Sequence, residues 1–260
     1  MELTIYQVDA FASERFKGNP AAVVPLDAWL SDAVMQDIAQ ENNLAETAFF
    51  VPQGEGFHLR WFTPVVEVDL CGHATVATAH VLYEHLAYNK NSITFQSRSG
   101  VLTVEKRNSQ YLLNFPPDEL VKIENAPHLV EAIGTSPVAI YQGKMDWLVV
   151  LEEQAQIENL RPDFRKIAEA GGRGTIVTAP GSEVDFVSRC FFPQTGVDED
   201  PVTGSAHTSL APYWAKRLGK NKLSAKQISR RGGTLAIEWK GERTEIGGEA
   251  VTYLIGKIFL

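Results

Sequence analysis

Cysteine is nearly absent, because Cys71 and Cys190 are the only two in a chain of 260 residues. Two thiols cannot build a disulfide framework or a four-thiolate zinc site, and they fit a reducing compartment. The sequence also lacks the run of about 20 apolar residues that a membrane-spanning helix needs. Residues 1–11 have neither the basic region nor the apolar core of a secretory signal. We therefore expect a cytoplasmic protein with no membrane partner.

Positive charge is scarce as well: 24 Lys and Arg residues face 32 Asp and Glu, which gives a formal net charge of −8. Such a chain has no general affinity for nucleic acid or anionic membranes. Also missing are the Walker loop, the dinucleotide-binding glycine pattern, the serine-hydrolase elbow and the zinc-protease helix. The six histidines do not cluster at ligand spacings. We expect a small-molecule partner, with no metal and no cofactor.

The sequence does contain a repeated order of elements. Hydrophobic periodicity predicts ββαββαβββ within residues 3–115 and again within residues 138–247. The helices are expected at residues 31–41, 73–87, 162–170 and 205–218, and the last three strands of the second half at 226–230, 234–239 and 243–247. One strand, near residues 251–260, is left over and must pair with one of the two sheets.

Short motifs support the repeat more directly. Arg60–Pro64 leads to Gly72-His73-Ala74, and Arg189–Pro193 leads to Gly204-Ser205-Ala206, about half a chain later. A strand, a proline-containing loop, a glycine and a helix start that recur at this distance indicate internal duplication. We expect two similar domains, residues 1–116 and 117–250, with the segment 116–127 as the linker.

Gly72 and Gly204 both fall where a loop is predicted to turn into a helix. The free N–H groups of a first helical turn and the positive end of the helix dipole can bind an anion. The alternative is that each glycine only relieves crowding in a tight turn. Because the arrangement occurs twice, we favour a substrate carboxylate held in a cleft between the two halves.

Glu46 is the candidate acid–base residue. It follows a predicted helix and precedes the apolar strand that begins at Thr47, where a carboxylate is half buried. Burial disfavours the charged form, which suits a group that takes up and returns a proton. The alternative is a solvated loop glutamate. The matching place near Gly171-Gly172 has no acid, so proton transfer by Glu46 would be one-sided.

Other polar residues near the two helix starts are candidates with structural alternatives. The dipole favours a neutral ring on His73, although a lone histidine is often a structural hydrogen-bonding group. Asp200 is equally well placed to cap the second helix or to form an Asx turn. Cys71 could form a thiolate at the first helix start. A two-base epimerase, however, needs a second thiol where Thr203 stands.

These motifs resemble those of the PhzF-like family of phenazine biosynthesis proteins. The resemblance covers nearly the whole chain and rests on four ordered motifs: Gln7–Phe11 with Gly18–Val23, Asn43–Thr47, Phe62–Pro64 with Cys71–Thr75, and Glu199–His207. It implies an α+β, diaminopimelate epimerase-like fold with two pseudo-symmetric domains, each a mixed, barrel-like sheet around a central helix. It also implies that strand 251–260 returns to the first domain and that the protein is a homodimer.

The resemblance further implies the roles of the site residues. The proton-transferring residue would be Glu46, and the remaining catalytic residues would be His73, Asp200 and Ser205. The substrate-binding residues would be Cys71, Gly72, Ala74, Gly204 and Ala206. The family reaction is a cofactor-free hydrogen shift that isomerises a dihydro-hydroxyanthranilate. A shared site geometry does not carry the substrate over, because one fold hosts different chemistries.

We therefore expect a cofactor-independent isomerase that moves a proton within a small, unsaturated, anionic carboxylate substrate, with Glu46 as acid and base. Two alternatives remain open. One is a Cys71-dependent epimerase, racemase or dehydratase of an amino or hydroxy acid, and the other is a catalytically silent binding protein. The variant Cys71→Ala separates the first alternative from the isomerase, and a cleft without convergent polar groups would favour the second.

Overall fold

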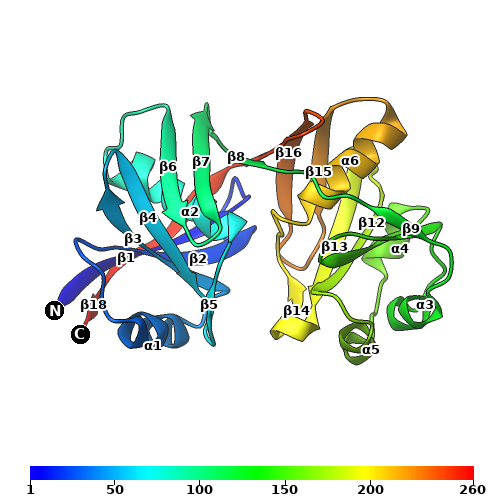
Figure 1. Ribbon diagram of the computed structural model, residues 1–260, viewed down its shortest axis with the longest axis horizontal. Coiled ribbons are helices and arrows are strands. Elements are labelled where there is room, and N and C mark those ends of the chain that lie inside the picture. Colours follow the sequence, from blue (N-terminus) through cyan, green and yellow to red (C-terminus); the bar gives the residue numbers. More distant parts are fainter. The chain divides into compact units, whose positions relative to one another are not determined.

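The computed structural model describes all residues from 1 to 260, and the chain divides into two compact units (Figure 1). Unit 1 comprises Met1–Asn114 and Gly247–Leu260, and unit 2 comprises Phe115–Ile246. Both units combine a mixed sheet with helices, which confirms the α+β class. None of the helices has the length and apolar character that crossing a membrane requires.

Unit 1 is a single mixed sheet with two helices. Its strands pair in the order β18, β1, β2, β3, β4, β6, β7, β8, and the short β5 lies beside β4. The β2–β3 and β4–β6 pairs are parallel, and the others are antiparallel. The elements are β1 Glu2–Ala10, β2 Asn19–Pro25, α1 Asp32–Asn42, β3 Glu46–Gln53, β4 Gly56–Phe62, β5 Glu67–Val68, α2 Gly72–His85, β6 Ser92–Ser97, β7 Gly100–Arg107, β8 Gln110–Phe115 and β18 Ala250–Phe259.

Helix α2 lies at the centre of unit 1. All residues from His73 to Leu82 are buried, which is expected of a helix rich in alanine, valine and threonine with no polar face. It contacts β1, β2, β3, β7 and β18, so the sheet wraps around it. Helix α1 packs on the outer face, where Met35 and Ile38 join Phe49 and Phe62 in one core cluster.

Unit 2 repeats this arrangement with additional short helices. Its strands pair in the order β9, β10, β11, β12, β13, β15, β16, with β14 beside β13, and the β11–β12 and β13–β15 pairs are parallel. The elements are β9 Val121–Ile123, α3 Pro127–Ile133, β10 Ala139–Gln142, β11 Asp146–Val150, α4 Gln154–Glu158, α5 Phe164–Glu169, β12 Gly174–Pro180, β13 Phe186–Phe192, a 3-10 turn Pro193–Thr195, β14 Val197–Asp200, α6 His207–Leu218, β15 Lys222–Gln227, β16 Gly233–Trp239 and β17 Thr244–Gly248.

Helix α6 is the counterpart of α2. Trp214 is fully buried, its indole N–H donates to Thr178 Oγ1 on β12 over 3.0 Å, and its ring stacks on Phe186 of β13. The helices α3, α4 and α5 cover the opposite face through a cluster that includes Ile157 and Val177. Each unit therefore has a central helix on one face of its sheet and peripheral helices on the other.

The duplication extends to individual side chains. Arg60 Nε lies 2.7 Å from Glu67 Oε1 in unit 1, and Arg189 Nε lies 2.7 Å from Glu199 Oε1 in unit 2. In each pair the arginine is on the fourth strand of the repeat and the glutamate on the short strand beside it. Two half-buried ion pairs in the same place are strong evidence for a common origin of the halves.

Strand β18 takes the position in unit 1 that β9 takes in unit 2. It pairs antiparallel with β1 along its length, and the red and blue strands of Figure 1 lie side by side. The leftover strand of the sequence pattern therefore completes the first sheet. The segment 116–127 is not only a linker as expected, because Val121–Ile123 forms β9 and pairs with β10.

Two boundaries in the second half differ from the prediction. The strand expected at 226–230 is β15, Lys222–Gln227, because Leu223, Ala225 and Gln227 are the residues that alternate inward. The helix expected from residue 205 begins at His207, since Gly204 accepts the His207 N–H in a turn that precedes the helix.

Candidate functional site

Glu46 is the first residue of β3. Helix α1 ends at Asn43, whose left-handed φ of 48° redirects the chain into the strand. Parallel pairing with β2 places Glu46 beside Ala21. The side chain is 17 % exposed, so Glu46 has the half-buried position expected and is not a solvated loop residue.

The two carboxylate oxygens of Glu46 have different surroundings. Oε2 is sealed from solvent and lies 3.0 Å from His73 Nε2, with no other polar contact. This contact is close but not well aligned as a hydrogen bond, which is common in catalytic sites before substrate binds. Oε1 has no hydrogen-bond partner and is not sealed. One oxygen is therefore anchored, and the other is free to react.

His73 lies on the first turn of α2, buried between two partners. Its Nδ1 is 3.1 Å from Asn19 Nδ2, and its Nε2 is the atom that meets Glu46. An amide NH₂ can only donate, so Nδ1 is assigned as the acceptor and Nε2 carries the proton. In this tautomer the protonated nitrogen, Nε2, is the one that lies beside the carboxylate.

The electrostatics of His73 and Cys71 are coupled. Burial works to lower the pKa of His73, but the Cys71 sulfur and the Glu46 carboxylate outweigh it, and the pKa is raised. For Cys71, burial and then Glu46 raise the pKa to about 11. The thiol therefore stays protonated at neutral pH. A neutral thiol does not raise the pKa of His73, so the neighbours that matter are Glu46 at one edge of the ring and Asn19 at the other.

Glu46, Cys71 and His73 each offer one donor atom, and the three atoms lie within 4.8 Å of one another. The Cys71 Sγ is 3.5 Å from His73 Nδ1 and 3.9 Å from Nε2. A thiolate, an imidazole and a carboxylate are ligands that Zn²⁺ accepts. A metal bound here would displace the thiol proton, so its binding would depend on pH.

In unit 2, Asp200 is the last residue of β14, and Ser205 lies on the loop that connects β14 to α6. Asp200 Oδ2 accepts the Thr203 hydroxyl over 2.5 Å. Helix α6 has no side-chain cap at Ala206, so the alternative that Asp200 caps this helix is wrong. Gln227, fully buried on β15, accepts the Thr203 N–H over 2.8 Å and donates to the Asp200 carbonyl over 2.7 Å.

Arg173 contacts Ser205 from the loop before β12. Its Nη2 is 3.2 Å from Ser205 Oγ, and its Nε is 2.9 Å from Asp146 Oδ1. A second contact joins Nη2 to Asp146 Oδ2 and makes the pair bidentate. Burial works to lower the pKa of Arg173, but hydrogen bonding and charge from Asp146 raise it. The guanidinium is therefore charged at any ordinary pH.

The glycines and alanines expected to bind substrate occupy helix starts. Gly72 is the first residue of α2, whereas Gly204 lies in the turn before α6. The side chains of Ala74 and Ala206 are fully buried.

The structure brings the candidate residues together as two groups. Glu46, Cys71 and His73 form one in unit 1, and Asp200 and Ser205 belong to the other in unit 2. Three further residues, Asn19, Arg173 and Gln227, contact these groups. The motif Gly18–Val23 contains Asn19, but nothing in the sequence marks Arg173 or Gln227 as a site residue.

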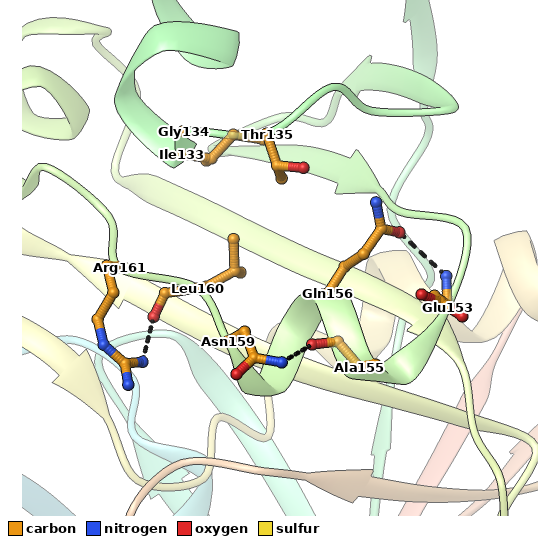
Figure 2. Close-up of a pocket in the computed structure, with 9 residues that line it drawn as sticks. All are labelled: Ile133, Gly134, Thr135, Glu153, Ala155, Gln156, Asn159, Leu160 and Arg161. Atoms are coloured by element: carbon orange, nitrogen blue, oxygen red, sulfur yellow. Dashed lines mark hydrogen bonds between the residues drawn. The ribbon is translucent and has the colours of Figure 1, made fainter.

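A separate surface pocket of about 430 Å³ lies in unit 2 between α3 and α4 (Figure 2). Its polar groups are largely satisfied by their neighbours. Asn159 Nδ2 donates to the Ala155 carbonyl, and Arg161 Nη1 donates to the Leu160 carbonyl. No candidate residue lines this pocket, so the site described above is the better candidate for chemistry.

Comparison with known proteins gives consistent results. The family model described as phenazine biosynthesis-like protein, PhzC-PhzF, matches residues 8–256. An uncharacterized isomerase of Pseudomonas aeruginosa is 50% identical over 260 residues, with 100% of both chains covered.

Solved structures agree in fold. A phenazine biosynthesis protein of the PhzF family from Enterococcus faecalis has a TM-score of 0.98 at 49% identity, with 100% of both chains covered. A hydroxyproline epimerase from Agrobacterium vitis has a TM-score of 0.64 at 11% identity, with 99% of this chain and 92% of that chain covered, and shows the shared epimerase-like fold alone. The chain therefore belongs to the PhzC-PhzF family of phenazine biosynthesis-like proteins.

Proposed function

We propose that this chain is an isomerase that moves a proton within a small unsaturated carboxylate, with Glu46 as the acid and base. The isomerase class is supported by family membership and by the relative of 50% identity that carries this name. The observation that supports the mechanism is the unequal placement of the two Glu46 oxygens. Oε2 is sealed from solvent 3.0 Å from His73 Nε2, and Oε1 has no partner in the protein.

The proposed reaction needs no other reactant. Glu46 Oε1 takes a proton from a carbon next to the unsaturated system, and the electron pair of the broken C–H bond spreads into that system. The double bond shifts, and the same carboxyl group returns the proton to a different carbon. Hydrogen-bond donors on the substrate's developing negative charge would lower the barrier. His73 keeps the carboxylate oriented through both steps.

The protonated thiol argues against Cys71 as the base. A thiol with a pKa of about 11 is rarely a thiolate at neutral pH, and only the thiolate accepts a proton well. Thr203 stands in the second unit where a two-base epimerase would need its other thiol, and its hydroxyl is already bonded to Asp200. Proton transfer by a single carboxylate fits these residues better.

The experiment is proton exchange in deuterated water, followed by NMR, with a panel of unsaturated and amino carboxylates that includes dihydro-hydroxyanthranilate. Wild type should exchange or isomerise at least one compound, and Glu46→Gln should not. Thermal shifts with the same compound should show that the variant still folds and binds. Exchange by Glu46→Gln at the wild-type rate would reject the assignment.

A further inference from the structure

The two units differ at the position of Glu46. In the sheet of unit 1, Thr47 pairs with Phe62, and in unit 2 Thr175 pairs with Phe191. The residue before each threonine is Glu46 in unit 1 and Gly174 in unit 2. The position of the catalytic carboxylate is therefore occupied by glycine in the second copy.

Gly174 cannot carry a side chain in this position. A Cβ there would lie 2.1 Å from Phe192 Cδ1 and 2.5 Å from the Phe191 carbonyl oxygen, closer than atoms can approach. The preceding residue, Arg173, supplies the side chain instead. It contacts Ser205 over 3.2 Å, and Ser205 follows Gly204 as His73 follows Gly72. Glu46 meets the helix start of unit 1, and Arg173 meets the helix start of unit 2.

Part of the Arg173 guanidinium makes no hydrogen bond within the protein. Nε and Nη2 donate to Asp146, and Nη2 also donates to Ser205. Nη1 carries two N–H groups, makes no hydrogen bond in the protein, and is not sealed from solvent. The side chain is 29 % exposed, whereas its partner Asp146 is 6 % exposed. If the only role of Arg173 were to neutralise Asp146, the two solvent-accessible N–H groups of Nη1 next to the Ser205 hydroxyl would have no use.

In Arg189 of the same unit, all three guanidinium nitrogens make hydrogen bonds. Its Nε and Nη2 bind Glu199, and its Nη1 donates to the carbonyls of Ile157 and Leu160. It is half as exposed as Arg173, at 13 %. Both arginines have a carboxylate partner, but only Arg173 keeps donors free.

We infer that Arg173 and Ser205 form a carboxylate-binding subsite within unit 2, in which Arg173 Nη1 and the Ser205 hydroxyl donate to the carboxylate of a small molecule. This inference goes beyond the proposed function, because it is argued from the contacts of unit 2 alone. The bidentate contact with Asp146 holds the guanidinium in one orientation before the anion binds. Ordering of this kind reduces the entropy lost on binding.

The test measures equilibrium binding of 4-fluorobenzoate by ¹⁹F NMR, with 4-fluorobenzamide as the uncharged match. Wild type should bind the carboxylate and not the amide. Arg173→Gln should bind it about 10- to 100-fold more weakly, the range expected for loss of a charged hydrogen bond. Arg173→Lys should recover part of the affinity, since lysine keeps the positive charge but lacks the planar set of donors of the guanidinium.

Two further variants separate binding from folding. Arg173→Gln leaves Asp146 buried without its cation, so the double variant Asp146→Asn/Arg173→Gln removes both charges and should show the same loss of binding. Arg189→Gln is the matched control, which loses a paired arginine of the same unit and should bind as wild type does.

The inference is overturned if wild type does not distinguish the carboxylate from the amide, if Arg173→Gln binds as tightly as wild type, or if Arg189→Gln loses as much affinity. Because no turnover is measured, a failure of the isomerase proposal would appear in the exchange experiment and not here.

Discussion

Asn19 and Glu46 contact opposite edges of one imidazole ring. Asn19 Nδ2 is 3.1 Å from Nδ1 of His73, and Glu46 Oε2 is 3.0 Å from Nε2. The amide comes from the first residue of β2, the carboxylate from the first residue of β3, and the ring from the start of α2. Three elements of unit 1 thus fix the tautomer that presents Nε2–H to the carboxylate.

The tautomer leads to a first prediction, on Asn19→Asp. A carboxylate in place of the amide would accept from Nδ1–H, so the pKa of His73 should rise further than in wild type. The proton shared with Glu46 would then be held more tightly, and exchange should slow by about 10- to 100-fold. The ¹⁵N shifts of the ring, followed as a function of pH, report its protonation directly. A ring that titrates at the same pH in Asn19→Asp and in wild type would contradict the assignment.

A second prediction concerns Gln227. Replacing it by leucine leaves the Thr203 N–H and the Asp200 carbonyl without their buried partner. The free energy of unfolding should fall by about 2–4 kcal/mol, and exchange should slow about 100-fold as Asp200 moves.

Gln194→Leu is the control for this change. The Gln194 amide donates to the Ile167 carbonyl in the same unit, over 2.9 Å, and touches no candidate residue. Denaturation with urea and NMR exchange together separate the two variants. The role of Gln227 would be purely structural if both lost stability and neither lost activity.

A third prediction is the loss of stability in acid. Burial lowers the pKa of His207 to about 4, against the hydrogen bond to the Thr203 carbonyl, which raises it. Between pH 6.5 and pH 4 the unfolded chain binds a proton that the folded chain does not, so the free energy of unfolding falls as the pH falls. The loss from this group is on the order of 3 kcal/mol and is complete below about pH 4.

His207→Asn keeps a donor for the carbonyl and removes the titration. Urea unfolding at pH 7 and at pH 4 should show a smaller difference between the two pH values in the variant than in wild type. His80, whose pKa burial also lowers to about 4, contributes its own acid loss in both proteins. An unchanged difference would show that His207 does not titrate as its burial requires.

A fourth prediction concerns zinc. Protein treated with a chelator should exchange at the full rate, and added Zn²⁺ should inhibit it through Glu46, Cys71 and His73. Cys71→Ala removes one ligand and should need at least about tenfold more zinc for the same inhibition. Loss of activity on chelation and its return with Zn²⁺ would instead make the ion part of the catalyst.

Much of the fold was predictable because short sequence motifs occur in both halves and indicate the duplication. Arg60 and Arg189 precede a proline by the same spacing, and both form the same ion pair in the structure. Strand β15 was misplaced because its inward residues include alanine and glutamine, which are weak strand signals. The inward glutamine, Gln227, is buried because it makes hydrogen bonds to the backbone of Thr203 and Asp200. Hydrophobic periodicity does not reveal such a contact.

The site was predictable where a motif marked it and not where tertiary contacts make it. Glu46 and His73 lie in recognisable motifs, and the structure brings them within 3.0 Å. Arg173 follows two glycines with positive φ, in a loop without hydrophobic pattern. Its relation to Ser205, 32 residues away, is a tertiary contact between side chains of two separate loops. That Gly174 takes the place of Glu46 in the second unit became visible only through the strand register.

The central claim is that Glu46, and not Cys71, transfers the proton. The most direct measurement is the rate of proton exchange into one substrate by Glu46→Gln and by Cys71→Ala, compared with wild type under identical conditions. Loss of an acid–base group typically costs about 10²- to 10⁴-fold, so Glu46→Gln should slow exchange by that factor while Cys71→Ala stays within about threefold of wild type. The opposite order, with exchange lost in Cys71→Ala and retained in Glu46→Gln, would contradict the account and make the thiol the base.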